Sequence, residues 1–179
     1  MTMDLVLATT NKGKQREFNQ VLAPLGWTLR GLEGYNAPEV EETGLSFVEN
    51  ALLKARAACQ ISGLAALADD SGLVVPHLNG EPGIYSARYG GRHGDGAANI
   101  QRLLARLDGA EGEQRRAYFY TALVLMTHAE DPTPIIALGR WDGYILQQVR
   151  GDGGFGYDPV FRAVGDTRSA AELDAEEKN

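Results

Sequence analysis

The stretch that decides the fold runs from Arg116 to His128, RAYFYTALVLMTH, and returns from Ile135 to Gln148, IIALGRWDGYILQQ. Both segments are rich in aromatic and aliphatic residues, a composition typical of β-strands. The linker between them contains Asp131-Pro132-Thr133-Pro134 and is short, and short connections join antiparallel neighbours. The pair therefore argues against a purely parallel, doubly wound sheet.

The rest of the chain alternates between strand and helix patterns. The predicted strands are short and apolar: Asp4–Ala8, Trp27–Leu32 and Leu64–Ala68, with Leu73–Val75 continuing the last one after a turn-like Asp69–Gly72. The predicted helices follow polar or capping residues: one to about Leu25, Ser46–Ser62, Asp95–Leu107 and one opening at Ser169. Residues 76–94 hold many glycines and predict a long surface connection. This mixture predicts an α/β protein with a mixed, partly antiparallel central sheet flanked by helices.

Composition restricts the class of protein. A chain of 179 residues with 44% hydrophobic residues suits one domain, which can fold as two lobes around one core. A net charge of −7 argues against a nucleic-acid binder, which would need a basic stripe. No apolar run reaches the length of a membrane span or a signal peptide, and the single cysteine, Cys59, fits a reducing compartment. We expect a cytoplasmic protein without membrane or nucleic-acid partners.

The segment Thr9 to Lys14, TTNKGK, lies between a predicted strand and a predicted helix. Backbone N–H groups at a helix N-terminus favour anions, and hydroxyls and lysines add donors. The segment is not a Walker motif, because aligning Gly13-Lys14 puts Ala8 at the first glycine and Gln15 at the metal-binding Ser/Thr. It is either a phosphate site or an ordinary polar helix cap with solvated lysines.

Carboxylates gather at Asp69-Asp70-Ser71-Gly72 and, elsewhere in the chain, at Glu41-Glu42. The tetrapeptide follows a predicted buried strand, and ligands of α/β sheets gather at strand ends. Magnesium usually takes one or two protein carboxylates plus substrate phosphates. If the strand persists, Asp69 and Asp70 point to opposite faces and cannot share a role. Taken alone, the tetrapeptide is better explained as a turn.

A third segment, Gly153 to Pro159, GGFGYDP, combines glycines with aromatics. Glycines bring the backbone close to a ligand, and an aromatic ring between them can stack on a planar base. Glycines followed by Asp-Pro are also typical of a plain turn. In isolation this segment does not separate the two interpretations.

Taken together and in order, these segments resemble the Ham1 / inosine triphosphatase family of non-canonical purine nucleoside triphosphate pyrophosphatases. The blocks that carry the resemblance are Ala8–Lys14, Glu41–Gly44, Phe47–Ala51 with Lys54-Ala55, Ala68–Leu73, Pro82–Tyr89, Gly153–Pro159, and Ala171–Leu173 with Glu176–Lys178. They cover essentially the whole chain. The resemblance implies a two-lobed fold with the active site in the cleft, and a homodimer.

The resemblance also implies an activity and its residues. The activity is hydrolysis of ITP, dITP and XTP between the α and β phosphates, giving the monophosphate and pyrophosphate with Mg²⁺ as cofactor. Asp70 is implied as general base and, with Glu41, as magnesium ligand, which leaves Asp69 a supporting role. The implied substrate-binding residues are Thr9, Thr10, Asn11, Lys12, Gly13 and Lys14 for the triphosphate, Ser71, then Phe155, Gly156, Tyr157 and Asp158 for the base, with Phe155 stacking, and Lys178 on the nucleobase side.

The chain departs from the family at its C-terminal end. In the family a Ser-His-Arg segment that reads the base follows the lysine that Lys178 matches, whereas the sequence here ends at Asn179. The last predicted helix has a start signal and no stop, so we expect residues 1–179 to be one pyrophosphatase domain without its C-terminal tail. Two alternatives remain open: a Maf-type pyrophosphatase acting on other nucleotides, and a nucleotide-binding protein without turnover.

Overall fold

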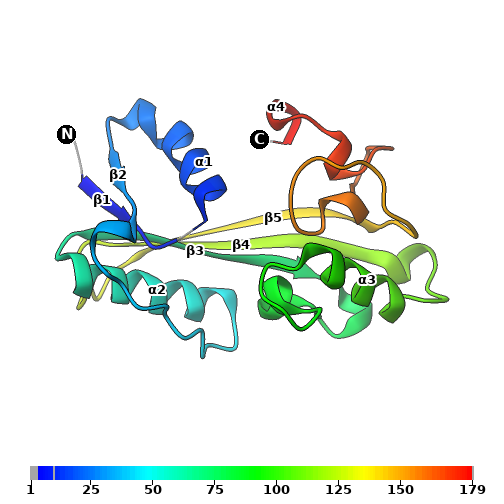
Figure 1. Ribbon diagram of the computed structural model, residues 1–179, viewed down its shortest axis with the longest axis horizontal. Coiled ribbons are helices and arrows are strands. Elements are labelled where there is room, and N and C mark those ends of the chain that lie inside the picture. The colour runs from blue at the N-terminus through cyan, green and yellow to red at the C-terminus, as the bar shows by residue number, and fades with distance from the viewer. Residues whose placement is uncertain (1–3, 10, 179) are drawn as a thin grey trace. The chain divides into compact units, whose positions relative to one another are not determined.

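The structure is a computed structural model that describes residues 4–9 and 11–178, and its strands form one six-stranded sheet (Figure 1). The strands are β1 (Asp4–Leu7), β2 (Thr28–Arg30), β3 (Ala65–Val74), β4 (Arg116–Met126), β5 (Ile135–Ile145) and β6 (Phe161–Ala163), in the order β2-β1-β3-β4-β5-β6. β1 pairs in parallel with β2 and β3, whereas β5 and β6 are antiparallel. The predicted mixed sheet is therefore confirmed.

Three of the four α-helices among the described residues lie close to their predicted places, and the fourth, α4, starts later than predicted. They are α1 (Lys12–Leu22), α2 (Phe47–Ser62), α3 (Gly96–Arg106) and α4 (Ala175–Lys178). α1 ends earlier than the predicted Leu25 and gives way to a 3₁₀ turn at Ala23–Leu25, where Pro24 has no backbone N–H to continue the α-helical ladder. No helix within the described residues has the length and apolarity needed to cross a membrane.

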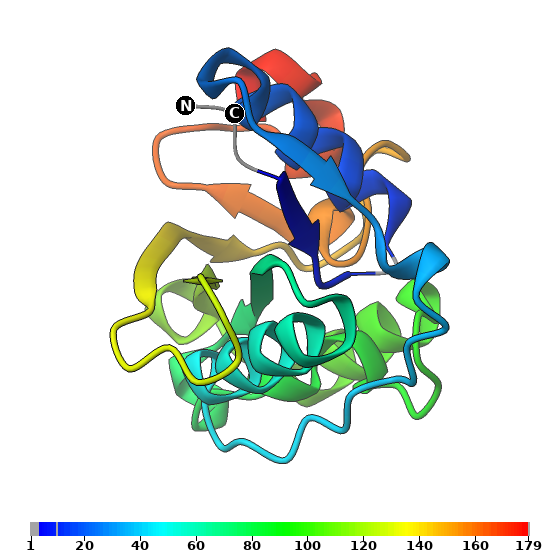
Figure 2. The same cartoon turned by 90° about the vertical axis from the view of Figure 1, so that its left-hand side faces the viewer.

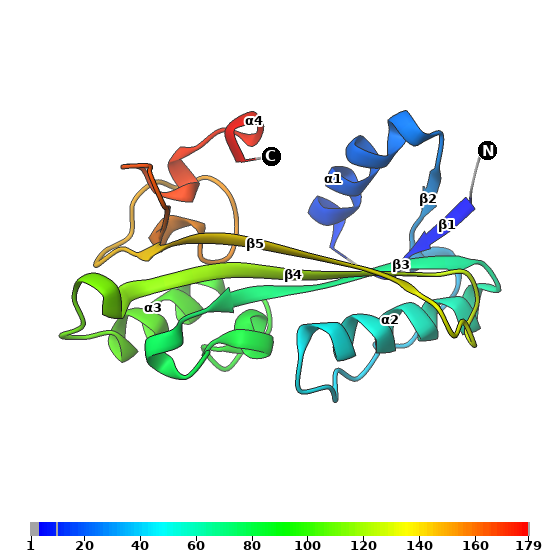
Figure 3. The same ribbon diagram turned by 180° about the vertical axis from the view of Figure 1, so that it is seen from behind.

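The chain divides into two compact units. Unit 1 comprises Met1–Asp70 and Thr121–Leu138, and unit 2 comprises Ser71–Tyr120 and Gly139–Asn179. In unit 1, α1 lies on one face of the strands and α2 on the other (Figures 1 and 3), and Figure 2 shows β1 and β2 side by side. α2 buries Ala51, Ala55 and Ala58 at helical spacing, and these small side chains let the helix lie close to β1.

Unit 2 is held together by an apolar core with a group of aromatic rings. α3 buries Ile100 and Leu103 in this core. The rings of Phe119, Trp141 and Phe161 pack against one another, with centroid separations of 4.6 to 6.2 Å. Such offset aromatic contacts add to the stabilisation gained from burial. Phe161 belongs to β6, a three-residue strand too short for its apolar pattern to be recognised in the sequence.

The predicted break in the strand after Ala68 is wrong. β3 continues without interruption from Ala65 to Val74, so Asp69-Asp70-Ser71-Gly72 is strand and not a turn. A turn would use the carboxylates to bond nearby backbone, but lysines of two helices take both carboxylates instead. The backbone of the tetrapeptide therefore stays in the extended conformation.

Two other local predictions also need correction. Residues 76–94 are more than a surface connection, because they form 3₁₀ turns at Pro76–Leu78 and Gly83–Arg88 and bury Leu78, Ser86 and Tyr89. The capping box of Ser169 and Glu172 is present but opens only the 3₁₀ turn Ala170–Glu172. The helix α4 starts later, where the Asp174 carboxylate accepts the backbone N–H of Glu177 at 2.8 Å.

Candidate functional site

The loop Thr9–Lys14 in unit 1 forms the cap of α1. The side-chain oxygen of Asn11 accepts the backbone N–H groups of Gly13 at 2.9 Å and Lys14 at 3.2 Å, and Thr9 Oγ1 accepts that of Asn11 at 3.2 Å. Asn11 thus already satisfies two of the donors that an anion would use. The exposed Lys12 adds a cation beside the cap, whereas Thr10 lies outside the described residues. The segment therefore caps α1, and a phosphate bound here would share these donors with Asn11.

Asp69 and Asp70 lie on opposite faces of β3, as strand alternation predicted. Asp69 Oδ2 accepts a hydrogen bond from the ammonium group of Lys14 in α1. The Asp69 side chain is 5% exposed, so this carboxylate is a buried anchor for Lys14. Asp69 therefore holds a lysine of the candidate phosphate loop, and its supporting role stays a prediction.

Asp70 faces the other helix of unit 1. Its Oδ1 lies 3.0 Å from Nζ of Lys54 in α2, and the same ammonium group lies 2.9 Å from Oε1 of Glu42. The three side chains are 11 to 24% exposed, so solvent screens this charge cluster only partly. Lys54 therefore joins β3 to the loop that carries Glu41 and Glu42, which is called the acidic loop below.

The surroundings of Asp70 shift its acidity. Burial raises the pKa of the Asp70 carboxyl above its ordinary value, and the Glu42 carboxylate raises the pKa further. The Lys54 ammonium acts against both effects. A carboxylate with a raised pKa accepts a proton more readily near neutral pH, which suits a general base.

The carboxylates of unit 1 fit a magnesium ion that shares its coordination with a substrate. Oδ2 of Asp70 is buried and accepts no hydrogen bond from the described residues, so this anionic oxygen lacks a partner. Glu41 is exposed in the loop, and the structure brings its neighbour Glu42 to Lys54. Within the described residues no three His, Cys, Asp or Glu side chains gather around a metal position. One or two carboxylates completed by phosphates therefore fit, whereas an all-protein cage does not.

The aromatic loop of unit 2 is organised by Asp158. This carboxylate is 5% exposed, and its Oδ2 accepts the backbone N–H of Phe155 at 2.9 Å and the ammonium group of Lys178 at 2.6 Å. The Phe155 ring is 62% exposed and Tyr157 is 4% exposed. Asp158 thus ties the exposed ring and the lysine to one buried point.

The remaining predicted residues of unit 2 have structural surroundings. The Tyr157 hydroxyl donates to the Ser86 carbonyl at 2.8 Å, and burial raises the pKa of this tyrosine. Gly156 has φ +60°, a left-handed conformation that favours glycine. Ser71 is half-buried in β3, directly after Asp70. Tyr157 therefore supports the loop from the core, while Phe155 is the aromatic side chain available to a ligand.

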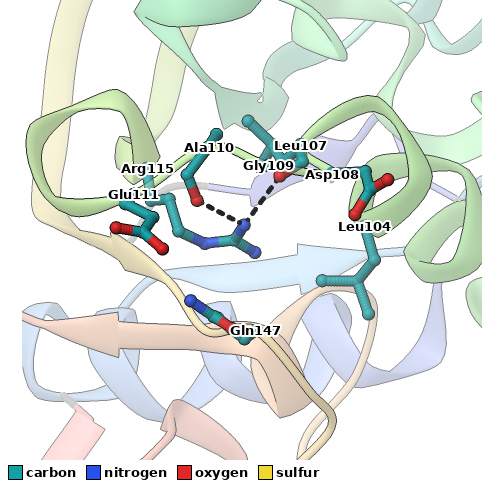
Figure 4. A pocket seen from close by; sticks show the side chains of 8 residues that line it. All are labelled: Leu104, Leu107, Asp108, Gly109, Ala110, Glu111, Arg115 and Gln147. Carbon is teal, nitrogen blue, oxygen red and sulfur yellow. Dashed lines mark hydrogen bonds between the residues drawn. The ribbon is translucent and has the colours of Figure 1, made fainter.

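A cavity of about 140 Å³ in unit 2 contains none of the predicted residues. Arg115 lines it, and Figure 4 shows this guanidinium directed at the carbonyl groups of Leu107 and Ala110. Its other nitrogens donate to Ile145 and Leu146. Because Arg115 is bound to four backbone carbonyls, it is a structural tie between the end of α3 and the end of β5.

The residues of both units occur in a sequence that matches the Ham1 family over residues 5–179. The chain belongs to the Ham1 family. A protein of Thioalkalivibrio sulfidiphilus named dITP/XTP pyrophosphatase is 51% identical over 177 residues, which are 99% of this chain and 90% of that protein. A protein of the same name from Legionella pneumophila is 53% identical over 176 residues, 98% of this chain and 90% of the relative.

Solved structures of Ham1 proteins share the fold. A HAM1 protein from Coxiella burnetii has a TM-score of 0.93 at 44% identity, covering 99% of this chain and 90% of its own. A nucleoside-triphosphatase / dITP/XTP pyrophosphatase from Mycobacterium abscessus has a TM-score of 0.84 at 46% identity, covering 98% and 91%. These similarities confirm the Ham1 fold predicted from the sequence blocks.

The sequence patterns indicate no role for Lys54 or Asn50, and they leave Glu42 unexplained. Lys54 and Asn50 lie four residues apart on α2, beside the buried alanines of that helix. Polar residues on the buried face of a helix are uncommon unless they have partners, and this spacing was the available signal. Nothing in the sequence separates Glu42 from Glu41, because an irregular loop has no period that says which side chain turns inward.

Proposed function

We propose that this protein hydrolyses ITP, dITP and XTP between the α and β phosphates, releasing the nucleoside monophosphate and pyrophosphate. The observation that carries the proposal is Asp70, a buried carboxylate with a raised pKa held by Lys54 on a strand. Relatives at 51% and 53% identity named dITP/XTP pyrophosphatases support the same substrate class. Such an enzyme removes deaminated purines from the nucleotide pool.

In the proposed reaction, Asp70 accepts the proton of the water that attacks the α-phosphorus. Lys54 keeps Asp70 ionised and in place, and the phosphate loop, including Lys12 and Thr9, binds the triphosphate. Lys14, the last residue of that loop, is held by Asp69 and adds positive charge to the loop. Asp70 and Glu41, together with the substrate phosphates, would hold the magnesium ion, which would supply neutralisation of phosphate charge and Lewis-acid activation. No covalent nucleophile is required, because positioning dominates such phosphoryl chemistry.

Base selection is proposed to come from the loop of unit 2. The exposed Phe155 ring stacks on the purine, and Lys178 directs ammonium N–H groups at the 6-position while Asp158 takes one of them. A keto oxygen at that position accepts such a donor, whereas the amino group of adenine leaves it unpaired. Discrimination against a partner that leaves a buried donor unpaired can be large.

The assembly and location follow from the same proposal. Ile135, Ile136 and Leu138 are exposed large apolar side chains on β5, and a surface of this kind supports a homodimer. The buried free thiol of Cys59 supports a reducing, cytoplasmic location, where nucleotide pools are found. Sedimentation analysis of the purified protein tests the dimer, since a monomer at all concentrations contradicts it.

The decisive experiment measures pyrophosphate release from ITP, XTP, GTP and ATP, with and without Mg²⁺. We expect fast, magnesium-dependent release from ITP and XTP and slow release from GTP and ATP. Equal rates on all four nucleotides, or a preference for another nucleotide, would favour the Maf-type alternative. Binding of ITP without release of pyrophosphate would favour a nucleotide-binding protein.

A further inference from the structure

The helices α2 and α3 begin with the same arrangement of side chains. Each has a capping residue, Ser46 or Asp95, and each carries a buried asparagine as its fourth helical residue, Asn50 or Asn99. In α2, Asn50 Oδ1 accepts the backbone N–H of Gly44 at 2.8 Å. In α3, Asn99 Oδ1 accepts the backbone N–H of Gly90 at 2.5 Å. The carbonyl half of each asparagine thus ties a glycine to the first turn of its helix.

Both glycines lie directly against their helix. A Cβ atom added at Gly44 would lie 2.6 Å from the Glu49 Cβ, and one added at Gly90 would lie 2.5 Å from the Ala98 carbonyl carbon. Neither position has room for a side chain. This hydrogen bond between a glycine and an asparagine is therefore the same in both units. It accounts for the burial of the asparagine carbonyl oxygen without any ligand.

The side-chain NH₂ group of this asparagine has different surroundings in the two helices. Asn99 Nδ2 donates to the Ala87 carbonyl at 3.3 Å. Asn50 Nδ2 and Asp70 Oδ2 are the two buried side-chain atoms, among the described residues, that make no hydrogen bond. The Asn50 side chain, as a hydrogen-bond donor, lowers the pKa of Asp70, so its amide lies close to that carboxylate, although the two atoms make no well-formed hydrogen bond. A buried donor beside a buried acceptor, both unused, indicates a contact that forms in another state of the site.

We propose that Asn50 is a positioning residue of the candidate site, whose carbonyl holds the acidic loop at Gly44 and whose amide orients Oδ2 of Asp70. One side chain then fixes the loop that carries Glu41 and Glu42 against the carboxylate of Asp70. Lys54, one helical turn later, makes the matching pair of contacts, to Glu42 and to Oδ1 of Asp70. This inference rests on the proposed function in one respect: it treats the loop carboxylates, Glu41 and Glu42, and the Asp70 carboxylate as parts of one magnesium site.

The first test uses the wild-type protein labelled with nitrogen-15 at its asparagine side chains. We expect the Asn50 NH₂ signals to shift when Mg²⁺ and pyrophosphate are added together, because the amide then hydrogen-bonds Asp70. The Asn99 NH₂ signals, already bonded to a carbonyl, serve as the internal control and stay in place. Unchanged Asn50 signals at saturating Mg²⁺ and pyrophosphate would overturn the proposal.

The second test compares Asn50→Leu with Asn99→Leu. Each variant loses the hydrogen bond between a glycine backbone N–H and the asparagine side chain, so we expect similar falls in melting temperature. Only Asn50→Leu should weaken Mn²⁺ binding, measured by electron paramagnetic resonance with pyrophosphate present, by about 10-fold or more, the range for residues that orient metal ligands. The magnesium concentration for half-maximal pyrophosphate release should rise in parallel. Equal Mn²⁺ affinity in Asn50→Leu, Asn99→Leu and wild type would reduce Asn50 to a structural tie.

The two tests separate this inference from the proposed function. If wild type releases no pyrophosphate from ITP, the proposed function fails, while Mn²⁺ binding and the Asn50 signals still report on the positioning role. If wild type is active and neither readout responds, the positioning role alone fails. Should Asn50→Leu not fold, the measurement on the labelled wild-type protein decides.

Discussion

The ammonium group of Lys54 lies 3.0 Å from Oδ1 of Asp70 and opposes the effect of burial on that carboxyl group. Burial raises the pKa of Asp70, and the Lys54 charge lowers it again. Replacing Lys54 with methionine removes the lowering effect while keeping an unbranched side chain. We expect the acid limb of the pH profile of kcat/KM to move to higher pH, because the base then loses its proton only at higher pH.

The shape of that pH profile distinguishes a shifted pKa of the general base from a displaced helix. In Lys54→Met, activity should fall at acidic and neutral pH and partly recover at alkaline pH. The control Lys54→Arg keeps a cation near Asp70 and should move the acid limb less. A uniform loss at every pH would mean that Lys54 only holds α2 in place.

The opposite orientations of Asp69 and Asp70 predict different kinetic defects. Asp70→Asn removes the proton acceptor and should lower kcat on the order of 10² to 10⁴-fold, with the melting temperature nearly unchanged. Asp69→Asn releases Lys14 from its anchor and should chiefly raise KM, because Lys14 belongs to the loop proposed to bind phosphate. Steady-state pyrophosphate release and thermal melts measure both effects. Full activity in Asp70→Asn would exclude it as the base.

Strand alternation predicted this separation of Asp69 and Asp70, although the strand end was wrong. Alternation is a local geometric rule that holds wherever the backbone is extended. The end of a strand depends on what the side chains bind, and the sequence does not show that Lys14 and Lys54 take the two carboxylates. Turn propensity was therefore overridden by contacts distant in sequence.

The aromatic loop shows the same division between what a pattern predicts and what packing decides. GGFGYDP indicated an aromatic held by glycines, and the structure has one exposed ring, Phe155, at 62% exposure. Tyr157, two residues on, is 4% exposed because its hydroxyl reaches the Ser86 carbonyl. No local rule separates the two rings. Ser86 lies in a segment that the glycine content misassigned to the surface.

Gly154 is predicted to be required for base selection. It has φ +71°, and an added Cβ would lie 2.2 Å from Asp158 Oδ2 and 2.8 Å from the Lys178 ammonium nitrogen. Gly154→Ala should therefore separate Lys178 from Asp158, raise KM for ITP by about 10-fold and reduce discrimination between ITP and ATP. Initial rates on both nucleotides measure this.

Gly165→Ala is the matched control for that variant. Gly165 also has a positive φ, +86°, but nothing lies within 4 Å of an added Cβ. It therefore shares the backbone strain, on the order of 1 kcal/mol, without the obstruction. Unaltered discrimination in Gly154→Ala, or an equal loss in Gly165→Ala, would exclude the proposed role of the Asp158–Lys178 pair.

Asp131 is predicted to stabilise the turn between β4 and β5 in a pH-dependent way. Its carboxylate accepts the backbone N–H groups of Thr127 at 2.9 Å and Thr133 at 2.8 Å, and the Thr127 hydroxyl at 2.8 Å. These bonds lower its pKa to about 2, whereas an unfolded aspartate has a pKa of about 3.9. The stabilisation is therefore fully present above about pH 4 and is lost as the pH falls through about 2.

The variant Asp131→Ala should lower the urea midpoint at pH 7, and its deficit relative to wild type should shrink in a series toward pH 2.5. Protonation removes from wild type the charged acceptor that the variant lacks at every pH. The exposed neighbour Glu130, replaced by alanine, serves as the control for changing a charge at this turn. A deficit of constant size across the series would assign the effect to packing of the Asp131 side chain and not to its charge-assisted hydrogen bonds.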